Sequence, residues 1–363
     1  MHFGEPLEDE RLTALLRPGE GIDTVITADV YGSGEADLAL GRALGGVPRD
    51  SYCLVGAIGH DFYDGEREGA KGFPRFTDPR LRGEEQYASY IREATERSLE
   101  RCGAERFDLL LLHNPDQIGY SSPAVWDGMR AVRDASLTDR LGVAPGPANG
   151  FTLDLIACME RFASLIDWAM IILGPLEPWP GELVLDAAAK HDVSLITRVV
   201  DYGGMFHDDV LPGHAFAAYD HRKFRPEGWV DAGREKLERM RPFAQRHELT
   251  MLQLACAWNL AQPGVRCVVP SLIQESGPDA RTIEDKRAEL AAVATQGSLS
   301  EEEILAIRAI GENTGCMTLK GASLEHDGEP RADKWGVDDE LSEVAGRWGI
   351  DPKRDLLAHA VPS

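Results

Sequence analysis

A run of large apolar residues, FDLLLLHNPD at residues 107–116, constrains the fold more than any other stretch of the chain. Four consecutive leucines after an aromatic residue are typical of a strand that is buried on both faces, as in a parallel sheet covered by helices. Pro115 has no backbone N–H and cannot continue a central strand, so we expect the strand to end near His113. The stretch therefore predicts an α/β protein with a polar group at the carboxyl end of a buried strand.

Similar strands alternate with amphipathic helices along most of the sequence. We expect eight strands, with ends near Gly4, Thr27, Ile58, His113, Ala144, Leu173, Val200 and Pro270. We expect the helices between them near residues 9–16, 35–44, 84–102, 123–135, 152–164, 181–191, 230–247, 250–261 and 279–293. Eight strand–helix units predict a closed (β/α)8 barrel, the TIM barrel, over residues 1–296. Residues 297–363 fall outside this repeat and predict a C-terminal helical extension that packs on the barrel, with helices near 300–310 and 338–348.

Composition and charge narrow the classes of function. The 363 residues carry a formal net charge of −23, which argues against nucleic acid or an anionic membrane as a partner but allows a small-molecule substrate. No apolar run is long enough to cross a membrane, and the N-terminus lacks a secretory signal. The six cysteines form no C-x-x-C pair, which indicates reduced thiols. We therefore expect a cytoplasmic protein, and its oligomeric state stays open.

Polar side chains gather where the expected strands end. Because the carboxyl ends of barrel strands form the functional face, this pattern favours an active site. Tyr31 and His113 make a plausible acid–base pair, in which the phenol donates a proton and the imidazole orients a carbonyl group. The alternative is that these groups only cap helices and turns. His60, Asp61, His113 and Asp116 have no spacing typical of metal ligands, so no metal site is predicted. The full set of strand-end residues is Asp29, Tyr31, His60, Asp61, His113, Asn114, Asp116, Arg198, Asp201 and Tyr202.

Four segments together resemble the aldo-keto reductases. They are TADVYGSGEADLALGRAL, FDLLLLHNPD, the LGVA strand and LTMLQLACAWNLAQPGVRCVVPSLIQ, and the resemblance covers roughly residues 4–293. It implies a barrel that binds NADP(H) across its carboxyl-end face and transfers hydride to a carbonyl group. It also implies a catalytic Tyr that is supported by Asp, Lys and His.

Carried over position by position, the resemblance assigns Tyr31 and His113 as catalytic residues. The supporting Asp of the family falls on Ile26 and its Lys falls on Ala57. Because a nearby Lys lowers the pKa of a phenol, Tyr31 should be a weaker acid–base group without these partners. The supporting or substrate-binding residues that we expect are Asp29, His60, Asn114, Arg198, Asp201 and Tyr202.

The cofactor positions are kept only in part. The family's Ser-Asn pair and Gln, which hold the nicotinamide carboxamide, fall on Ala144, Pro145 and Met170. At the adenosine end, the resemblance assigns cofactor contacts to Ser271, Arg281, Glu284 and Asp285. Lys286 and Arg287 add positive charge there, where barrels often bind phosphate. The alternative is an ordinary charged helix surface.

Three functions follow as open alternatives. The first is an NADP(H)-dependent oxidoreductase of aldo-keto reductase type that acts on a small carbonyl or sugar-like substrate. The second is a non-redox lyase, dehydratase or isomerase that acts on a carbohydrate-like ligand at the same site. The third is a catalytically degraded binding protein. Fold alone does not decide between them.

The C-terminal extension contains NTGCMTLKGAS at residues 313–323, a stretch of small residues between acidic flanks. We expect it to pack over the barrel mouth, with Lys320 or Cys316 near Ala57. The alternatives are a position along an outer helix or a contact between subunits.

Overall fold

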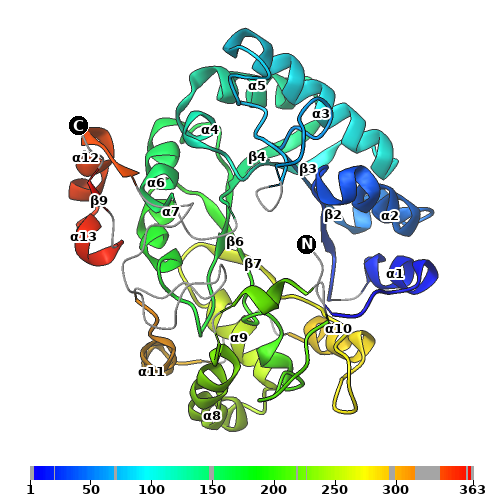
Figure 1. The fold of residues 1–363 in the computed structure, drawn as a ribbon, viewed down its shortest axis with the longest axis vertical. Coiled ribbons are helices and arrows are strands. Elements are labelled where there is room, and N and C mark those ends of the chain that lie inside the picture. The colour runs from blue at the N-terminus through cyan, green and yellow to red at the C-terminus, as the bar shows by residue number, and fades with distance from the viewer. Residues whose placement is uncertain are drawn as a thin grey trace.

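The computed structural model of the chain describes residues 4–19, 21–68, 72–146, 151–217, 220–225, 227–293, 299–314, 336–356 and 359–360. Within these ranges, seven parallel strands form one sheet in the order β1-β2-β3-β4-β5-β6-β7. The sheet curls, and helices surround its outer side (Figure 1). This is the arrangement of a (β/α)8 barrel. The first expected strand lies outside the described residues, apart from Gly4.

The seven strands end at or within two residues of the positions that the sequence predicts. They are β1 Thr24–Ile26, β2 Cys53–Ile58, β3 Phe107–His113, β4 Thr138–Ala144, β5 Trp168–Ile172, β6 Ser194–Arg198 and β7 Val265–Val269. Each pairs in parallel with its neighbour; for example, His113 is in register with Ala144 and Ile172 with Arg198. The carboxyl ends of all seven therefore lie on one face.

The helices also follow the expected order. They are α1 Asp9–Leu16, α2 Glu35–Leu44, α3 Tyr87–Cys102, α4 Gln117–Ser121, α5 Pro123–Asp134, α6 Thr152–Arg161, α7 Leu185–Lys190, α8 Trp229–Arg246, α9 Met251–Leu260 and α10 Ile283–Ala291. The short α4 is an addition, and it begins because the Asp116 side chain accepts a hydrogen bond from Gly119 N at 2.8 Å. Helix α10 starts later than expected because Thr282 is its N-cap.

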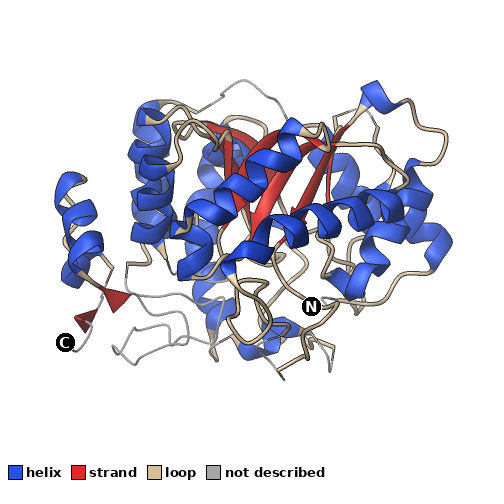
Figure 2. Ribbon diagram, turned by 90° about the horizontal axis from the view of Figure 1, so that it is seen from above, coloured by secondary structure: helices blue, strands red, loops and turns tan. Residues whose placement is uncertain are grey.

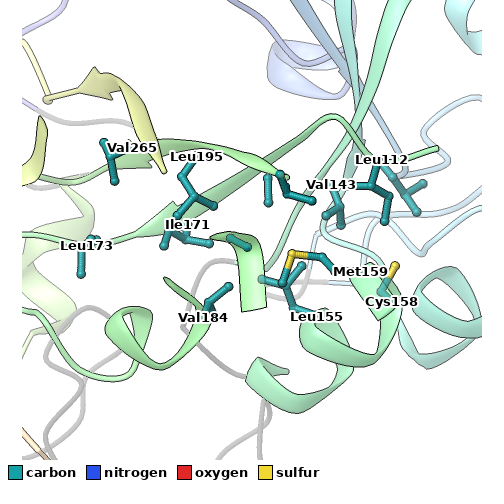
Figure 3. Close-up of a cluster of buried hydrophobic side chains, with 14 of the residues drawn as sticks. Leu112, Val143, Leu155, Cys158, Met159, Ile171, Leu173, Val184, Leu195 and Val265 are labelled. Atoms are coloured by element: carbon teal, nitrogen blue, oxygen red, sulfur yellow. The ribbon is translucent and has the colours of Figure 1, made fainter. Parts of the chain in front are cut away.

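The leucine run of β3 shows how the strands divide their side chains. Leu110 and Leu112 belong to the core between sheet and helices, whereas Leu109 and Leu111 belong to a cluster inside the barrel. This alternation follows from the period of two along a strand. Figure 3 shows part of the outer core, where Leu112 and Val143 lie near Met159 of α6.

The C-terminal elements are α11 Glu301–Gly311, β8 Gly336–Val337, α12 Asp339–Arg347, α13 Pro352–Asp355 and β9 His359–Ala360. Helix α11 packs beside α8 and α9, where Trp258 Nε1 donates to the Ile304 carbonyl at 3.0 Å. Helices α12 and α13 lie outside α6 and α7 (Figures 1 and 2). Arg347 pairs there with Glu160 at 2.6 Å.

Most of the stretch at residues 313–323, including Cys316 and Lys320, lies outside the described residues. The described Asn313 exchanges two hydrogen bonds with the backbone of Trp179, at 2.9 and 3.0 Å. Among the described helices, none combines the length and apolar character that a membrane crossing requires.

Candidate active site at the carboxyl ends of the strands

Three aromatic side chains from neighbouring strand ends meet on the functional face. Tyr31 follows β1, His60 follows β2, and His113 is the last residue of β3. The rings of Tyr31 and His113 lie edge to face, with centroids 5.6 Å apart and planes at 88°. The rings of His60 and His113 are 5.3 Å apart at 69°. The expected proximity of Tyr31 and His113 is confirmed, whereas their catalytic roles stay predictions.

A tight turn directs Tyr31 to this place. The Tyr31 N–H donates to the Ala28 carbonyl at 2.9 Å, and the chain then passes through positive φ angles at Gly32, Ser33 and Gly34. A Cβ atom on Gly34, whose φ is +100°, would lie 2.9 Å from the Arg101 side chain. Glycine is therefore required at this position, and α2 can begin directly after the turn.

Both histidines are neutral at neutral pH. Burial lowers the pKa of His113 well below its usual value, and the nearby His60, Arg198 and Arg75 lower it further. Burial lowers the pKa of His60 to about 4, and Arg75 acts in the same direction. The partners of His60 favour one tautomer: Nδ1–H donates to the Phe73 carbonyl at 3.0 Å, and Nε2 accepts from Asn114 Nδ2 at 3.1 Å. His113 Nδ1 is buried without a hydrogen-bond partner among the described residues.

Tyr31 keeps its proton at neutral pH, and Arg198 supplies positive charge beside it. About half of the Tyr31 surface, 48%, is accessible to solvent. The protein around the rest of the ring desolvates the phenol and raises its pKa, and the charge of Arg198 acts in the opposite direction. Arg198 stands at the end of β6, where its Nη2 donates to the carbonyls of Pro145 and Gly146 at 3.2 and 3.0 Å.

Asn114 and Arg75 fix the loops around the two histidines. Asn114 has a φ of +48°, and its N–H donates to the Ala144 carbonyl at 2.7 Å. Arg75 donates through Nε to the Asn114 carbonyl, and its Nη1 lies 3.2 Å from His60 Nδ1. Sequence reasoning missed Arg75 because it lies in the long loop after β2 with no recognisable motif.

Asp29 lies under the face rather than on it. Its side chain is fully buried, and neither carboxyl oxygen has a hydrogen-bond partner among the described residues. Burial raises the pKa of Asp29 well above its usual value, and repulsion from Asp37 adds to this rise. Asp37 itself accepts from Thr27 Oγ1 at 2.7 Å and from Ser98 Oγ at 2.8 Å. Asp29 is thus a buried carboxyl group whose protonated form is favoured by its surroundings.

Asp201 and Tyr202, both predicted site residues, have clear structural contacts. Asp201 accepts from Gly204 N at 2.6 Å and from Ser271 N at 2.8 Å, so it joins the loop after β6 to the segment after β7. Tyr202 is buried with a φ of +53°, and its ring lies 5.0 Å from the Arg225 guanidinium.

Two further buried charged residues follow β5 and β6, and sequence reasoning missed both. Glu177 is 2% exposed, and its Oε2 has no hydrogen-bond partner among the described residues. Burial raises the pKa of Glu177 to about 8, although Arg225 and Arg198 lower it. Arg225 is also buried, and its Nη1 donates to the Tyr202 carbonyl at 3.1 Å. The only signal in the sequence was the position of Glu177 shortly after a strand end.

Several polar positions of the family form an apolar floor in this chain. Ala57, Ala144 and Met170 are buried in the hydrophobic cluster inside the barrel, and Ile26 packs against it. The replacements therefore form one continuous surface. A small cavity of about 10 Å³ lies beside it, lined by residues that include Pro145, Met170 and Arg198. That volume holds about one water molecule. The nicotinamide carboxamide of NADP(H) does not fit the chemistry of this surface, because the family's hydrogen-bonding side chains are replaced by Ala144, Pro145 and Met170.

At the expected adenosine end, the assigned residues already have partners. Arg281 pairs with Glu289 at 2.6 Å, and Glu284 pairs with Arg11 at 2.6 Å. Asp285 accepts from Thr282 Oγ1 at 2.6 Å, as part of the N-cap of α10. The Ser271 N–H is taken by Asp201. These residues hold the fold together in this structure, so a phosphate group would have to displace existing partners.

The two additional basic residues at this end are engaged in the same way. Lys286 is fully buried and pairs with Asp209 at 2.6 Å. Arg287 donates to the carbonyls of Leu15 and Arg17, at 3.1 and 2.6 Å. Within the described ranges, no three His, Cys, Asp or Glu side chains are grouped as a metal site would need.

Comparisons with known proteins agree with the fold. The model of the Aldo/keto reductase family matches residues 8–312. The chain is 23% identical over 279 residues to D-threo-aldose 1-dehydrogenase of a Pseudomonas species, covering 72% of this chain and 79% of that protein.

Two solved structures share the fold at low sequence identity. The glycerol dehydrogenase from Gluconobacter oxydans has a TM-score of 0.63 at 20% identity and covers 85% of this chain and 87% of its own. An aldo/keto reductase from Klebsiella pneumoniae, solved with NADP and acetate, has a TM-score of 0.56 at 18% identity and covers the same shares of the two chains. The Klebsiella protein thus binds NADP.

Proposed function

Because the chain belongs to the aldo/keto reductase family, its activity is best sought at the carboxyl ends of the strands, and we propose that it catalyses proton transfer on a small hydroxycarbonyl compound. The reaction is of the isomerase, dehydratase or lyase class on a carbohydrate-like substrate. Tyr31 is its acid, His113 is its base, and the nicotinamide cofactor takes no part.

The two groups start in the protonation states that this chemistry needs. The raised pKa of Tyr31 keeps the phenol protonated, and the lowered pKa of His113 keeps the imidazole able to accept a proton. Environments that push the pKa values of neighbouring groups apart are typical of acid–base pairs. Tyr31 donates its proton to the carbonyl oxygen, while His113 removes a proton from the adjacent carbon. The electron pair of that C–H bond forms the double bond of an enediol, and Arg198 stabilises the negative charge left on the phenol.

One observation carries the proposal: the acid–base pair is present while the groups that hold the nicotinamide are absent. Ala57, Ala144 and Met170 belong to one apolar cluster inside the barrel, and Ala144 is in register with His113.

Exchange of hydrogen with solvent tests this proposal directly. The protein is incubated without cofactor in D₂O with hydroxycarbonyl compounds such as glyceraldehyde, dihydroxyacetone and glucuronate. Deuterium entering at the carbon next to the carbonyl is followed by NMR. We expect exchange above the uncatalysed rate with the wild type and its loss in Tyr31→Phe. If no compound of this class exchanges hydrogen above the uncatalysed rate, the proposal is contradicted.

A second candidate is the NADP(H)-dependent oxidation or reduction of a small carbonyl or sugar-like compound. Family membership favours it, since the similar aldose and glycerol dehydrogenases are oxidoreductases by name. In this case Tyr31 would protonate the carbonyl oxygen without a base at the neighbouring carbon. The third possibility, a binding protein without catalysis, predicts ligand binding with neither exchange nor reduction.

The redox state of the cysteines is relevant to the cellular compartment in which the protein is found. The five described cysteines, Cys53, Cys102, Cys158, Cys256 and Cys267, are free thiols. Free thiols are common where the environment is reducing, and this supports our proposal of a cytoplasmic location.

A further inference from the structure

We propose that His60 is a positioning residue, whose ring packs against the imidazole of His113 and holds it in one orientation. The claim rests on the proposed function only for the role of His113 as a base, whereas the placement of the ring does not depend on turnover. His60 follows β2, and His113 ends β3, the neighbouring strand. Both residues are buried, at 8% and 7% exposure.

The first argument concerns what orients the ring of His113. A functional imidazole is usually fixed by a hydrogen bond at the nitrogen that does not react. His113 Nδ1 is buried and has no hydrogen-bond partner in the described part of the chain. Packing therefore holds this ring, and two aromatic rings lie against it, that of Tyr31 at 5.6 Å and that of His60 at 5.3 Å. Because Tyr31 is half exposed and His60 is buried, His60 is the neighbour that the surrounding protein holds more firmly.

The ring of His60 is itself fixed at both nitrogens. Its Nδ1–H donates to the Phe73 carbonyl at 3.0 Å, and its Nε2 accepts from Asn114 Nδ2 at 3.1 Å. Burial and, after it, the charge of Arg75 lower the pKa of His60 to about 4, so the ring is neutral at pH 7. A neutral ring whose two nitrogens both have protein partners is not free to exchange a proton with a substrate. His60 thus suits a positioning role and not that of a second base.

The backbone of His60 is held by the long loop that follows β2. This loop returns to the strand end, where the Asp61 N–H donates to the Pro74 carbonyl at 2.9 Å and the Phe76 N–H donates to the Gly59 carbonyl at 3.0 Å. These two hydrogen bonds enclose His60 in a short antiparallel bridge. The loop therefore extends the sheet beyond β2 and fixes the point from which the imidazole projects.

Helix α3 and strand β3 add further contacts to this strand end. The Tyr90 hydroxyl donates to the His60 carbonyl at 3.0 Å, and the Tyr90 ring stacks on the buried Phe76 at 5.1 Å and 7°. A Cβ atom on Gly59 would overlap the carbonyl oxygen of His113, so glycine lets the two strand ends approach closely. His60 is therefore a rigid support for the ring of His113, as a precisely placed catalytic group requires.

Two variants separate the ring of His60 from its hydrogen bonds. His60→Phe keeps a ring but loses both nitrogens, whereas His60→Gln keeps a donor and an acceptor but loses the ring. Proton–carbon correlation spectra of the imidazoles are recorded for the full chain without substrate, and the His113 signals are identified by their absence in His113→Gln. We expect one sharp set of His113 signals in the wild type and in His60→Phe, and a broadened or multiple set in His60→Gln.

Each variant decides the question by itself if the other does not fold. A single sharp set of His113 signals in His60→Gln, or a broadened set in His60→Phe, would overturn the proposal. His191→Gln is the matched control, because it also removes an imidazole that lies near an aromatic ring, that of Trp348 at 6.2 Å, but at the end of α7. Its His113 signals should match those of the wild type.

The solvent-hydrogen exchange reaction supplies a second measurement. Because a small displacement of a catalytic group is costly, kcat should fall by ~10-fold or more in His60→Gln with little change in KM, and His60→Phe should restore most of it. An equal loss of kcat in both variants would show that His60 acts through its nitrogens, against the proposal. If the wild type shows no exchange, the proposed reaction fails, and the spectra still decide whether His60 positions His113.

Discussion

The ring of Tyr31 meets the ring of His113 edge to face at 5.6 Å, although the two residues are 82 positions apart in the sequence. β1 and β3 are not neighbours in the sheet, so the contact forms across the curved interior face. One partner is partly accessible to solvent and the other is buried. The pair therefore joins a solvent-accessible phenol to a shielded imidazole.

Replacing Tyr31 with Phe should remove catalysis and leave the fold intact. The phenol O–H is lost, but the ring and its contact with His113 remain. We expect turnover to fall by a factor of about 10² or more, the usual contribution of a general acid. Steady-state kinetics and thermal unfolding check this. Tyr52→Phe, at the start of β2, is the matched control. Unchanged turnover in Tyr31→Phe would remove Tyr31 from the mechanism.

The buried Asp29 should make stability depend on pH. Because its pKa is raised in the folded state, the folded protein keeps a proton there that the unfolded chain releases above about pH 4. Stability should therefore fall as the pH rises from about 4 toward the raised pKa. Asp29→Asn lacks this proton, so it should be more stable than the wild type at pH 8, with a smaller difference near pH 4.

Asp37 provides the control for this experiment. It accepts hydrogen bonds from Thr27, Ser98 and Arg101, so Asp37→Asn should destabilise the protein at neutral pH. Urea unfolding between pH 4 and 8 measures both variants. A lower stability of Asp29→Asn than of the wild type at pH 8 would contradict a raised pKa of Asp29 in the folded protein.

The apolar floor should resist restoration of the family's ion pair. Ala57 is buried in the barrel cluster and Ile26 packs against it, so Ala57→Lys alone places a charge among hydrophobic side chains. We expect a loss of about 3 kcal/mol or more in unfolding free energy. Adding Ile26→Asp should recover part of this loss, as a double-mutant cycle would show. NADPH binding should stay absent in the double variant, because the carboxamide side of the site is unchanged. Tight NADPH binding by that variant would show that only the ion pair was lacking.

Much of this arrangement follows from the sequence by simple periodicity. Buried runs such as FDLLLLHNPD located the strands, and Pro115 located the end of β3, because these features act locally. The same reasoning brought Tyr31 and His113 to one face, since parallel strands share their carboxyl ends.

Other features depend on contacts between distant segments. Glu177 and Arg225 carry no motif, and their burial depends on how the segments after β5 and β6 fold over each other. The role of Arg281 is another example, because its partner Glu289 is known only once α10 is in place. Local sequence patterns predicted on which strand or loop each side chain lies. The contacts of that side chain depend on tertiary packing.

Helix α11 should be needed by the barrel itself. Trp258 donates to Ile304, and Glu303 pairs with Arg246 at 2.6 Å and with His247 at 2.9 Å. We expect truncation after residue 297 to lower the melting temperature by several degrees or to prevent folding. Truncation after residue 314 keeps these contacts and should be tolerated better. Equal melting temperatures for both truncated proteins and the full chain would show that α11 does not support the barrel.

The most direct measurement is an equilibrium titration of the full-length protein with NADPH and with NADH, followed by cofactor fluorescence. The central claim is an aldo/keto reductase barrel that performs acid–base chemistry without a nicotinamide cofactor. It predicts no saturable binding of either cofactor up to millimolar concentration, together with solvent-hydrogen exchange into a hydroxycarbonyl substrate. Saturable NADPH binding in the micromolar range, with hydride transfer to the same substrate, would contradict it.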